Sequence, residues 1–167
     1  YALVSALREK GLTLATAESC TGGLVSQLVT NVPGASEAFG FGFVTYANAA
    51  KQKLLGVSEE ALAKHGAVSP QVAAAMAAGA AKAAGADVAV SLTGIAGPGG
   101  GTPEKPVGLV YMGAARGADV FVKRLDLGSR DRATIRLAAA KNALDAARRL
   151  ALGLPIPGAV NARDIPD

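Results

Sequence analysis

The sequence predicts an α/β fold, a three-layer α/β/α sandwich around a mixed, mostly parallel sheet. Short apolar segments that are typical of buried strands alternate with longer amphipathic segments along most of the 167 residues. This alternation is the pattern of a parallel sheet that is covered by helices on both faces. Late in the chain, only a link around Arg116 and Gly117 separates two strand-like segments. That link is too short for a parallel crossover, so we expect this last pair to be antiparallel.

Glycines and small polar residues mark the first elements. A first amphipathic helix is expected to end at Gly11, where glycine can adopt the left-handed conformation of a helix cap. A buried strand follows over residues 12–17, and then a helix over residues 22–32 whose first turn Thr21 is placed to cap. Residues 39–46 alternate bulky side chains with glycines, which indicates a second strand that another backbone approaches closely.

The middle of the chain is expected to be mostly helical. A short helix should end at Gly56, and a second should start at Ser58, with acidic residues in its first turn. A third should start at Ser69, with proline at its first helical position. Residues 87–93 then form an apolar strand that leads into a glycine-rich loop over residues 94–106.

The last part of the chain completes the predicted domain, residues 1–152. Strands over residues 107–115 and 120–125 form the antiparallel pair, and a long helix runs from about Arg130 to Leu150 after a cap at Ser129. The tail, residues 153–167, contains three prolines and no apolar period. We therefore expect the tail to be an arm or a disordered segment.

Composition limits the class of function. Half of the residues are apolar and 18% are charged, which excludes general disorder. No apolar run approaches the roughly 18 residues that would indicate a membrane span. The net charge of +4 favours anionic partners such as a phosphorylated small molecule, and an aromatic content of 4% argues against a nucleic-acid stacking surface. One cysteine and one histidine are too few for an internal disulfide or a structural zinc site, so we expect a cytoplasmic protein without a metal.

Two junctions that follow predicted strands are candidate ligand sites. In the segment AESCTGG, residues 17–23, glycines let a backbone approach a ligand, and free N–H groups at the helix start attract an anion. In the segment SLTGIAGPGGG, residues 91–101, Thr93 stands at a strand end before a flexible loop. The two together describe a small-molecule pocket better than a protein interface. An ordinary capped turn and an ordinary flexible loop are the alternatives.

A possible serine and lysine pair lies around the second strand. The segments GASEAF and YANAAK flank this strand and are expected to bring Ser36, Tyr46 and Lys51 into one neighbourhood. Serine with lysine is a hydrolytic pairing that requires neither histidine nor metal. It requires a neutral lysine, whose pKa must fall by about 3 units from about 10.4. Burial can supply such a shift, so Lys51 must be largely desolvated if it is the base, and is otherwise a surface charge.

Two other residues are weaker candidates for catalysis. Cys20 precedes a predicted helix, a position that lowers the pKa of a thiol, but it also fits a small buried residue. His65 is expected at the end of a helix, where it interacts favourably with the helix dipole and has no evident further role.

Several segments together resemble the CinA C-terminal family, whose enzyme form is nicotinamide mononucleotide amidohydrolase. The resemblance covers about residues 3–150 in order, through AESCTGG, GASEAF, FVTYANAAK, HGAVSP, SLTGIAGPGGGTPEKPVGLVY and an arginine-rich segment at residues 130–136. It implies a fold like that of anticodon-binding domains and hydrolysis of nicotinamide mononucleotide to nicotinate mononucleotide and ammonia. It also implies no cofactor, a homodimer, no nucleic-acid or membrane partner, and a standalone role in pyridine nucleotide salvage in the bacterial cytoplasm.

The resemblance also implies catalytic residues. Ser36 would be the nucleophile, Lys51 the general base and Tyr46 a proton partner. Ser19 and Thr93 would position the carboxamide or stabilise the oxyanion. Which of Ser36 and Ser19 attacks stays open, and the choice does not alter the class of reaction.

A second group of residues would bind the substrate. Glu18 is expected near the cationic pyridinium ring. Thr21, the Gly22 and Gly94 backbones and Arg130 are expected at the ribose or the phosphate.

Two departures from the family pattern support an alternative. Ala49 stands where members often carry glutamate, and the segment GSRDRATIR is about two residues longer than usual, so that Arg130, Arg132 and Arg136 compete for one role. The alternative is a nucleotide-binding module without catalysis, associated with competence or damage.

Overall fold

The fold is built on one six-stranded sheet in the computed structural model, which describes residues 1–167. The strands are β1 Leu14–Glu18, β2 Phe39–Val44, β3 Val88–Gly94, β4 Leu109–Arg116, β5 Asp119–Asp126 and β6 Val160–Asn161, in the spatial order β2-β1-β3-β4-β5-β6. β1 pairs in parallel with β2 and β3, and the pairings of β3 with β4, β4 with β5 and β5 with β6 are antiparallel. The mixed sheet and the antiparallel β4–β5 pair are confirmed. The pairings are not mostly parallel, since two are parallel and three, including the one that the tail adds, are antiparallel.

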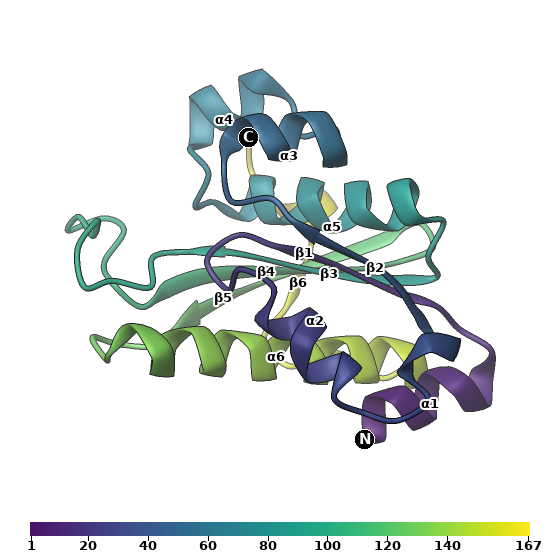
Figure 1. Ribbon diagram of the computed structural model, residues 1–167. Helices are drawn as coiled ribbons and strands as arrows, with labels where there is room; N and C mark the ends of the chain where they lie inside the picture. Colours follow the sequence, from purple (N-terminus) through teal and green to yellow (C-terminus); the bar gives the residue numbers. More distant parts are fainter.

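Helices cover both faces of the sheet, as the sandwich prediction requires (Figure 1). They are α1 Ala2–Lys10, α2 Leu24–Thr30, α3 Asn48–Leu55, α4 Glu59–His65, α5 Pro70–Ala84 and α6 Arg132–Leu152, with short 3-10 turns η1 Ala35–Glu37 and η2 Ala162–Asp164. α1, α2 and α6 lie on one face, α5 lies on the other, and α3 and α4 pack on α5. None of the helices is both long enough and apolar enough to cross a membrane.

Helix starts in the middle of the chain follow the predicted capping. The Ser58 side chain accepts a hydrogen bond from the Ala61 N–H at the start of α4. The Ser69 side chain accepts one from the Val72 N–H at the start of α5, where Pro70 occupies the first helical position. These caps satisfy N–H groups that have no partner inside the helix.

Two predicted caps are wrong, because a carboxylate replaces the hydroxyl in each. Thr21 does not cap α2, whose first N–H groups donate instead to the buried carboxylate of Glu18. Ser129 does not cap α6, which begins after Asp131, and the Asp131 carboxylate accepts from the Thr134 N–H. A carboxylate is favoured at these positions because it also interacts with the helix dipole.

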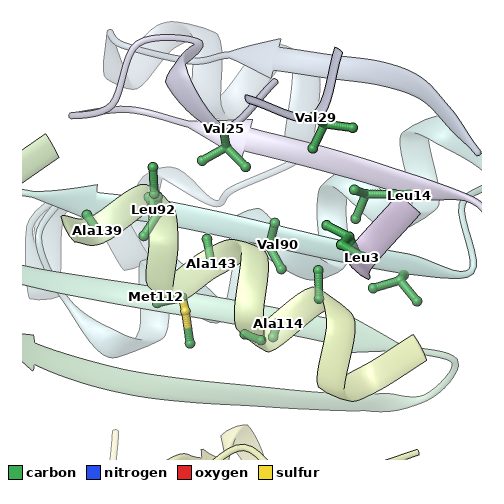
Figure 2. Close-up of a cluster of buried hydrophobic side chains, with 14 of the residues drawn as sticks. Leu3, Leu14, Val25, Val29, Val90, Leu92, Met112, Ala114, Ala139 and Ala143 are labelled. Carbon is green, nitrogen blue, oxygen red and sulfur yellow. The ribbon is translucent and has the colours of Figure 1, made fainter. Parts of the chain in front are cut away.

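The larger hydrophobic core lies between the sheet and α1, α2 and α6 (Figure 2). Small residues of α6, among them Ala139 and Ala143, pack over Val90, Leu92 and Met112 of the strands. A smaller core on the other face joins α5 to the sheet and to α3 and α4. Both helices that cover the sheet directly are rich in alanine, which allows them to lie close to it.

One glycine sets the spacing of the outer layer. Gly79 lies in the interior of α5, where glycine is less favourable than alanine by roughly 0.5–1 kcal/mol. A Cβ atom at this position would overlap the backbone of Leu55 at the end of α3. The glycine therefore allows α3 to pack directly on α5.

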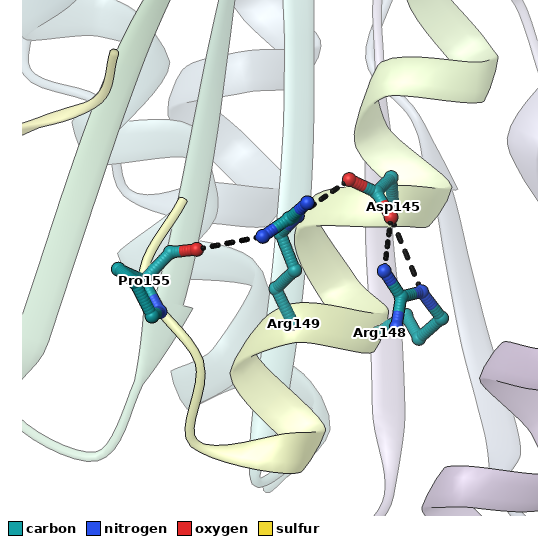
Figure 3. A network of polar contacts seen from close by, with 4 residues as sticks. All are labelled: Asp145, Arg148, Arg149 and Pro155. Atoms are coloured by element: carbon teal, nitrogen blue, oxygen red, sulfur yellow. Dashed lines mark hydrogen bonds and ion pairs between the residues drawn. The ribbon is translucent and has the colours of Figure 1, made fainter. Parts of the chain in front are cut away.

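The tail is an arm that folds back onto the domain, one of the two alternatives expected for it. The Arg149 side chain, in the last turns of α6, binds both Asp145 of the same helix and the carbonyl of Pro155 in the tail, as Figure 3 shows. The tail then adds β6 to the edge of β5, and the Gln71 side chain donates to the Pro166 carbonyl at 2.8 Å. β6 pairs with two residues of β5, Phe121 and Val122, so the strands at the two edges of the sheet are β2 and the short β6.

Candidate active site

A pocket of about 210 Å³ lies beyond the carboxyl ends of β1 and β3. Ligands of α/β folds bind preferentially at this edge of a sheet. The pocket is lined by Ser19, Cys20, Tyr46, Asn48, Lys51, Ala67, Val68, Thr93, Gly94, Ala96 and Arg132. The turn after β1, the start of α3, the end of β3 and the start of α6 therefore all contribute side chains to it.

Lys51 is buried at the base of this pocket. It lies on α3 and is 1% exposed, although lysine is almost never fully buried without a charged partner. Its Nζ lies 3.2 Å from the Ser19 Oγ, 2.9 Å from the Thr45 carbonyl oxygen and 3.3 Å from the Tyr46 carbonyl oxygen. No carboxylate forms an ion pair with it.

Burial lowers the pKa of Lys51 below its ordinary value, because a charged amine loses its hydration in this position. The only charge effect that opposes this shift comes from Cys20. Burial in turn raises the pKa of the Cys20 thiol to about 11, so this thiol is neutral near pH 7. The environment of Lys51 therefore shifts its protonation equilibrium toward the neutral amine, which is the form that a base requires.

The three contacts of Lys51 can be made by an ammonium group and also by a neutral amine. A neutral amine has two N–H donors and one lone pair, whereas an ammonium group has three donors and no acceptor. The two carbonyl oxygens of Thr45 and Tyr46 can only accept, so they fit the two N–H groups. The Ser19 Oγ can accept a hydrogen bond from the amine, and in the neutral form its hydroxyl can instead donate to the lone pair. This arrangement can remove the proton of Ser19 when that hydroxyl attacks.

The rim of the pocket carries a tyrosine and an arginine. The Tyr46 side chain is 61% exposed, and its hydroxyl accepts a hydrogen bond from Arg132 Nη2 at 3.1 Å. Arg132 Nη1 also donates to the Gly97 carbonyl at 2.8 Å, which connects α6 to the glycine-rich loop. Only the backbone carbonyl of Tyr46, not its hydroxyl, contacts Lys51. Thr93 is buried and donates its hydroxyl hydrogen to the Ala67 carbonyl at 2.7 Å.

Ser36 does not lie near Lys51, contrary to the expectation that they share one neighbourhood. It is exposed in η1, which precedes β2, whereas Lys51 follows β2. The six residues of β2 span about 20 Å at the usual rise of about 3.3 Å per residue. Because β2 runs parallel to β1, Ser36 lies at the amino end of the sheet and Ser19 at the carboxyl end. Of the two candidate serines, the structure brings Ser19 to the lysine.

The predicted substrate-binding residues are divided between the pocket and its supports. Gly94 lines the pocket. Glu18 does not line it, because its carboxylate is bound to the first residues of α2. Thr21 and Gly22 lie in the turn behind the lining residues, and Arg130 is exposed before α6 and outside the lining. Of these five residues, only Gly94 lines the pocket.

Sequence reasoning missed the arginine that lines the pocket. Three arginines competed for one role in the prediction, and Arg130 was the one expected to contact the substrate. In the structure Arg132 reaches the pocket, and Arg136 lies one turn further along α6. Asp131 is the signal that could have decided this, because an aspartate before a helix is a strong cap and places Arg132 at the first helical position. His65 does not line the pocket, and no group of three metal-ligating side chains gathers anywhere in the molecule.

Comparison with known proteins gives one family. The model of the CinA C-terminal domain matches residues 1–151. The chain is 55% identical over 152 residues to a CinA-like protein of Kosmotoga olearia, covering 91% of the chain and 37% of that protein. It is 56% identical over 156 residues to a putative competence-damage inducible protein of Symbiobacterium thermophilum, covering 88% of the chain and 36% of that protein. The chain thus spans little more than a third of the length of these relatives.

Solved structures with the same fold carry related names. The competence/damage inducible protein CihA of Agrobacterium tumefaciens is 43% identical with a TM-score of 0.81, and the match covers 87% of this chain and 93% of that one. A CinA superfamily protein of Klebsiella pneumoniae is 31% identical with a TM-score of 0.86, covering 91% and 94%. The chain therefore belongs to the CinA C-terminal domain family.

Proposed function

We propose that the protein is an amidase that hydrolyses the carboxamide of nicotinamide mononucleotide to nicotinate mononucleotide and ammonia. The observation that carries this proposal is the buried amine of Lys51, whose three neighbours are two carbonyl oxygens and the hydroxyl of Ser19. A neutral amine next to a serine is the arrangement that a serine and lysine hydrolase requires. The family resemblance supplies the substrate.

Ser19 is the nucleophile and Lys51 the general base in this proposal. The Ser19 Oγ attacks the carboxamide carbon while its proton passes to Lys51 Nζ. The carbon–nitrogen bond then breaks, and the leaving nitrogen takes that proton and departs as ammonia. Water attacks the resulting ester while one of its protons passes to Lys51, and this proton then moves to the Ser19 Oγ as the acyl group leaves. The carboxylic acid that is released loses its remaining proton to solvent and becomes the carboxylate. Atoms and charges balance without a metal or a cofactor.

The size of the pocket suits one end of the substrate. Its volume of about 210 Å³ lies below the roughly 300–1,000 Å³ that is typical of pockets for whole drug-sized ligands. The carboxamide and ring would occupy it, with the ring close to the aromatic side chain of Tyr46, which can stabilise a cationic ring. The ribose phosphate would extend over the rim, where Arg132 offers a guanidinium group suited to phosphate. Arg132 takes the role that the sequence analysis gave to Arg130.

An ammonia assay tests the proposal directly. Nicotinamide mononucleotide is expected to release ammonia, and free nicotinamide much less, because it lacks the phosphate that Arg132 binds. The Ser19→Ala variant should lose the activity and the Ser36→Ala variant should keep it. If calorimetry shows binding of the mononucleotide and the assay shows no ammonia, the chain is instead a nucleotide-binding module without catalysis.

Ala49, the departure that supported this alternative, leaves the contacts of Lys51 intact. It is exposed on α3 and does not line the pocket. The larger spacing near Arg130 likewise does not prevent an arginine from reaching the pocket, because Arg132 does so. We therefore favour the enzyme, which would act in pyridine nucleotide salvage in a reducing cytoplasm.

The proposal includes a homodimer formed at β2. This strand is one edge of the sheet and carries an apolar surface that includes the stacked rings of Phe41 and Phe43, 6.0 Å apart. Phe41 is 51% exposed. An open edge with apolar side chains readily pairs with another chain. Light scattering should give twice the mass of the chain, and Phe41→Lys should give a monomer if β2 is the interface.

A further inference from the structure

Two charged side chains form hydrogen bonds with the backbone of the turn over residues 19–23, one with its N–H groups and the other with its carbonyl groups. The first is Glu18, which is 1% exposed. Its carboxylate accepts hydrogen bonds from the N–H groups of Gly23, Val25 and Ser26 and from the Ser26 hydroxyl, at 2.8 to 3.1 Å. Glu18 therefore occupies the first N–H groups of α2, and these groups are not free to bind a ligand.

Arg136 of α6 is the second of these side chains. Its Nε donates to the Cys20 carbonyl at 3.1 Å, and its Nη2 donates to the Thr21 carbonyl at 2.7 Å. No carboxylate pairs with this guanidinium group. An arginine that is directed at two successive carbonyl groups fixes both peptide planes, because a peptide bond is planar.

Two N–H groups of the turn are left without an acceptor in another residue. The Ser19 N–H donates to the Leu92 carbonyl and the Gly22 N–H donates to the Ser19 carbonyl, whereas the N–H groups of Cys20 and Thr21 donate to no other residue, and that of Cys20 contacts only its own thiol. Both residues are buried, and the Thr21 hydroxyl also has no partner. Buried backbone N–H groups are nearly always paired, so two successive exceptions require an explanation.

The position of these groups supplies the explanation. Cys20 follows Ser19 directly and lines the pocket. Because the Cys20 carbonyl is bound by Arg136, the Thr21 N–H of the same trans peptide is directed away from Arg136. In acyl transfer, backbone N–H groups next to the nucleophile stabilise the negative oxygen of the tetrahedral intermediate. Thr93, the predicted donor for that oxygen, already donates its hydroxyl hydrogen to Ala67.

We propose that Arg136 and Glu18 are positioning residues that hold the turn so that the N–H group of Cys20, which lines the pocket, is free to bind the oxyanion formed on attack by Ser19. This inference rests on the proposed amidase function. Neither side chain contacts the substrate. Each acts through the backbone of the turn, Glu18 by occupying N–H groups of α2 and Arg136 by occupying the carbonyl groups.

Pyridine-3-boronic acid tests this proposal without substrate turnover. The Ser19 Oγ would form a bond to boron, its proton would pass to Lys51, and the product would be a tetrahedral anion that resembles the intermediate. ¹¹B NMR distinguishes tetrahedral from trigonal boron, and calorimetry measures affinity. Nicotinamide serves as the planar ligand, because the carbon of its carboxamide is trigonal in the bound ground state.

The Arg136→Gln variant should bind the boronic acid at least about tenfold more weakly, whereas the loss of a donor itself costs roughly 10²- to 10³-fold. Its affinity for nicotinamide should not change. The matched control is Arg149→Gln, which removes another arginine of α6 bound to a backbone carbonyl far from the pocket. This control should bind both ligands like the wild type. With nicotinamide mononucleotide, Arg136→Gln should lower kcat and leave KM nearly unchanged.

The outcomes separate this inference from the proposed function. An equal loss of affinity for both ligands in Arg136→Gln would show a merely structural role and overturn the inference, as would no loss for either ligand. Trigonal boron in the wild-type complex would overturn it as well. Tetrahedral boron that depends on Arg136, in a protein that releases no ammonia from the mononucleotide, would support the inference and reject the substrate.

Discussion

The two ends of the sheet carry very different pockets. The pocket at the carboxyl end has about 210 Å³, and a second pocket at the amino end, between the end of α5 and the β4–β5 turn, has about 800 Å³. The charged side chains of the larger pocket are Lys82, Asp87, Arg116 and Asp119. Asp87 is bound by the N–H and the hydroxyl of Thr13, and Arg116 donates to the Leu150 carbonyl.

The comparison shows that unusual bonding, and not volume, marks the candidate active site. At the amino end the lysine and both aspartates are exposed, where water can solvate them. At the carboxyl end a lysine is buried without a counter-ion, and two N–H groups of a buried turn have no acceptor in another residue. Such groups lower the stability of the fold, so their presence together indicates a functional site.

Replacement of each candidate serine by alanine should give the largest difference in activity between variants at the two ends of the sheet. Ser19→Ala is expected to lower ammonia release at least about 10³-fold, because the nucleophile is lost. Ser36→Ala, at the amino end, should retain wild-type kcat and KM. Equal activity of the two variants in the ammonia assay would contradict the assignment of Ser19.

Replacement of the buried lysine should separate activity from stability. Lys51→Met should abolish ammonia release and raise the Tm, because an amine that is costly to bury is replaced by an apolar side chain of similar length. Thermal unfolding monitored by circular dichroism measures the second effect. A lower Tm would show that the contacts of Lys51 outweigh its desolvation.

The same lysine predicts two pH dependences for the wild type. Activity should rise with pH through the lowered pKa of Lys51, because the neutral amine is the base. Between that value and the ordinary pKa of 10.5, the unfolded chain binds the proton that the folded chain has lost, so stability should also rise with pH. Lys51→Met should remove this part of the pH dependence of the Tm. An unchanged slope would contradict the lowered pKa.

Arg132 should affect binding more than chemistry. Arg132→Gln is expected to raise KM by roughly ten- to a hundredfold, since a hydrogen bond to a charged group contributes about 1.5–3 kcal/mol. Steady-state kinetics with nicotinamide mononucleotide measures this change. Arg130→Gln is the matched control, because Arg130 is exposed outside the pocket and should leave KM unchanged.

The smallest effect is expected at the amino end. The hydrogen bonds from Thr13 lower the pKa of Asp87, so this carboxylate stabilises the fold above its unfolded pKa, and the contribution is lost as pH falls through the folded pKa. Asp87→Asn should lower the Tm slightly at neutral pH and not in strong acid. The side chain is exposed, so solvent limits the effect. A loss of ammonia release in this variant would show that the larger pocket contributes to function.

Local patterns predicted most elements and both strand ends that form the pocket. The AESCTGG turn and the Thr93 strand end meet there because the carboxyl ends of neighbouring parallel strands share one edge of the sheet. Ser36 was misplaced because its segment also flanks β2, but at the opposite end. The prediction placed Ser36 near Lys51 because they are close in sequence, but the length of β2 separates them. The hydrogen bonds that Glu18 and Arg136 make to the backbone of the turn could not be predicted, because the two residues are 118 positions apart and come together only through the packing of α6 against α2 and β3.

The interior glycine of α5 has a consequence for engineering. Replacement of such a glycine by alanine is a common route to greater thermal stability. At Gly79 the added methyl group would displace α3, and α3 carries the amine that accepts the serine proton. A conventional stabilising substitution at this one position would therefore increase the proton-transfer distance, so libraries designed for heat resistance should leave Gly79 unchanged.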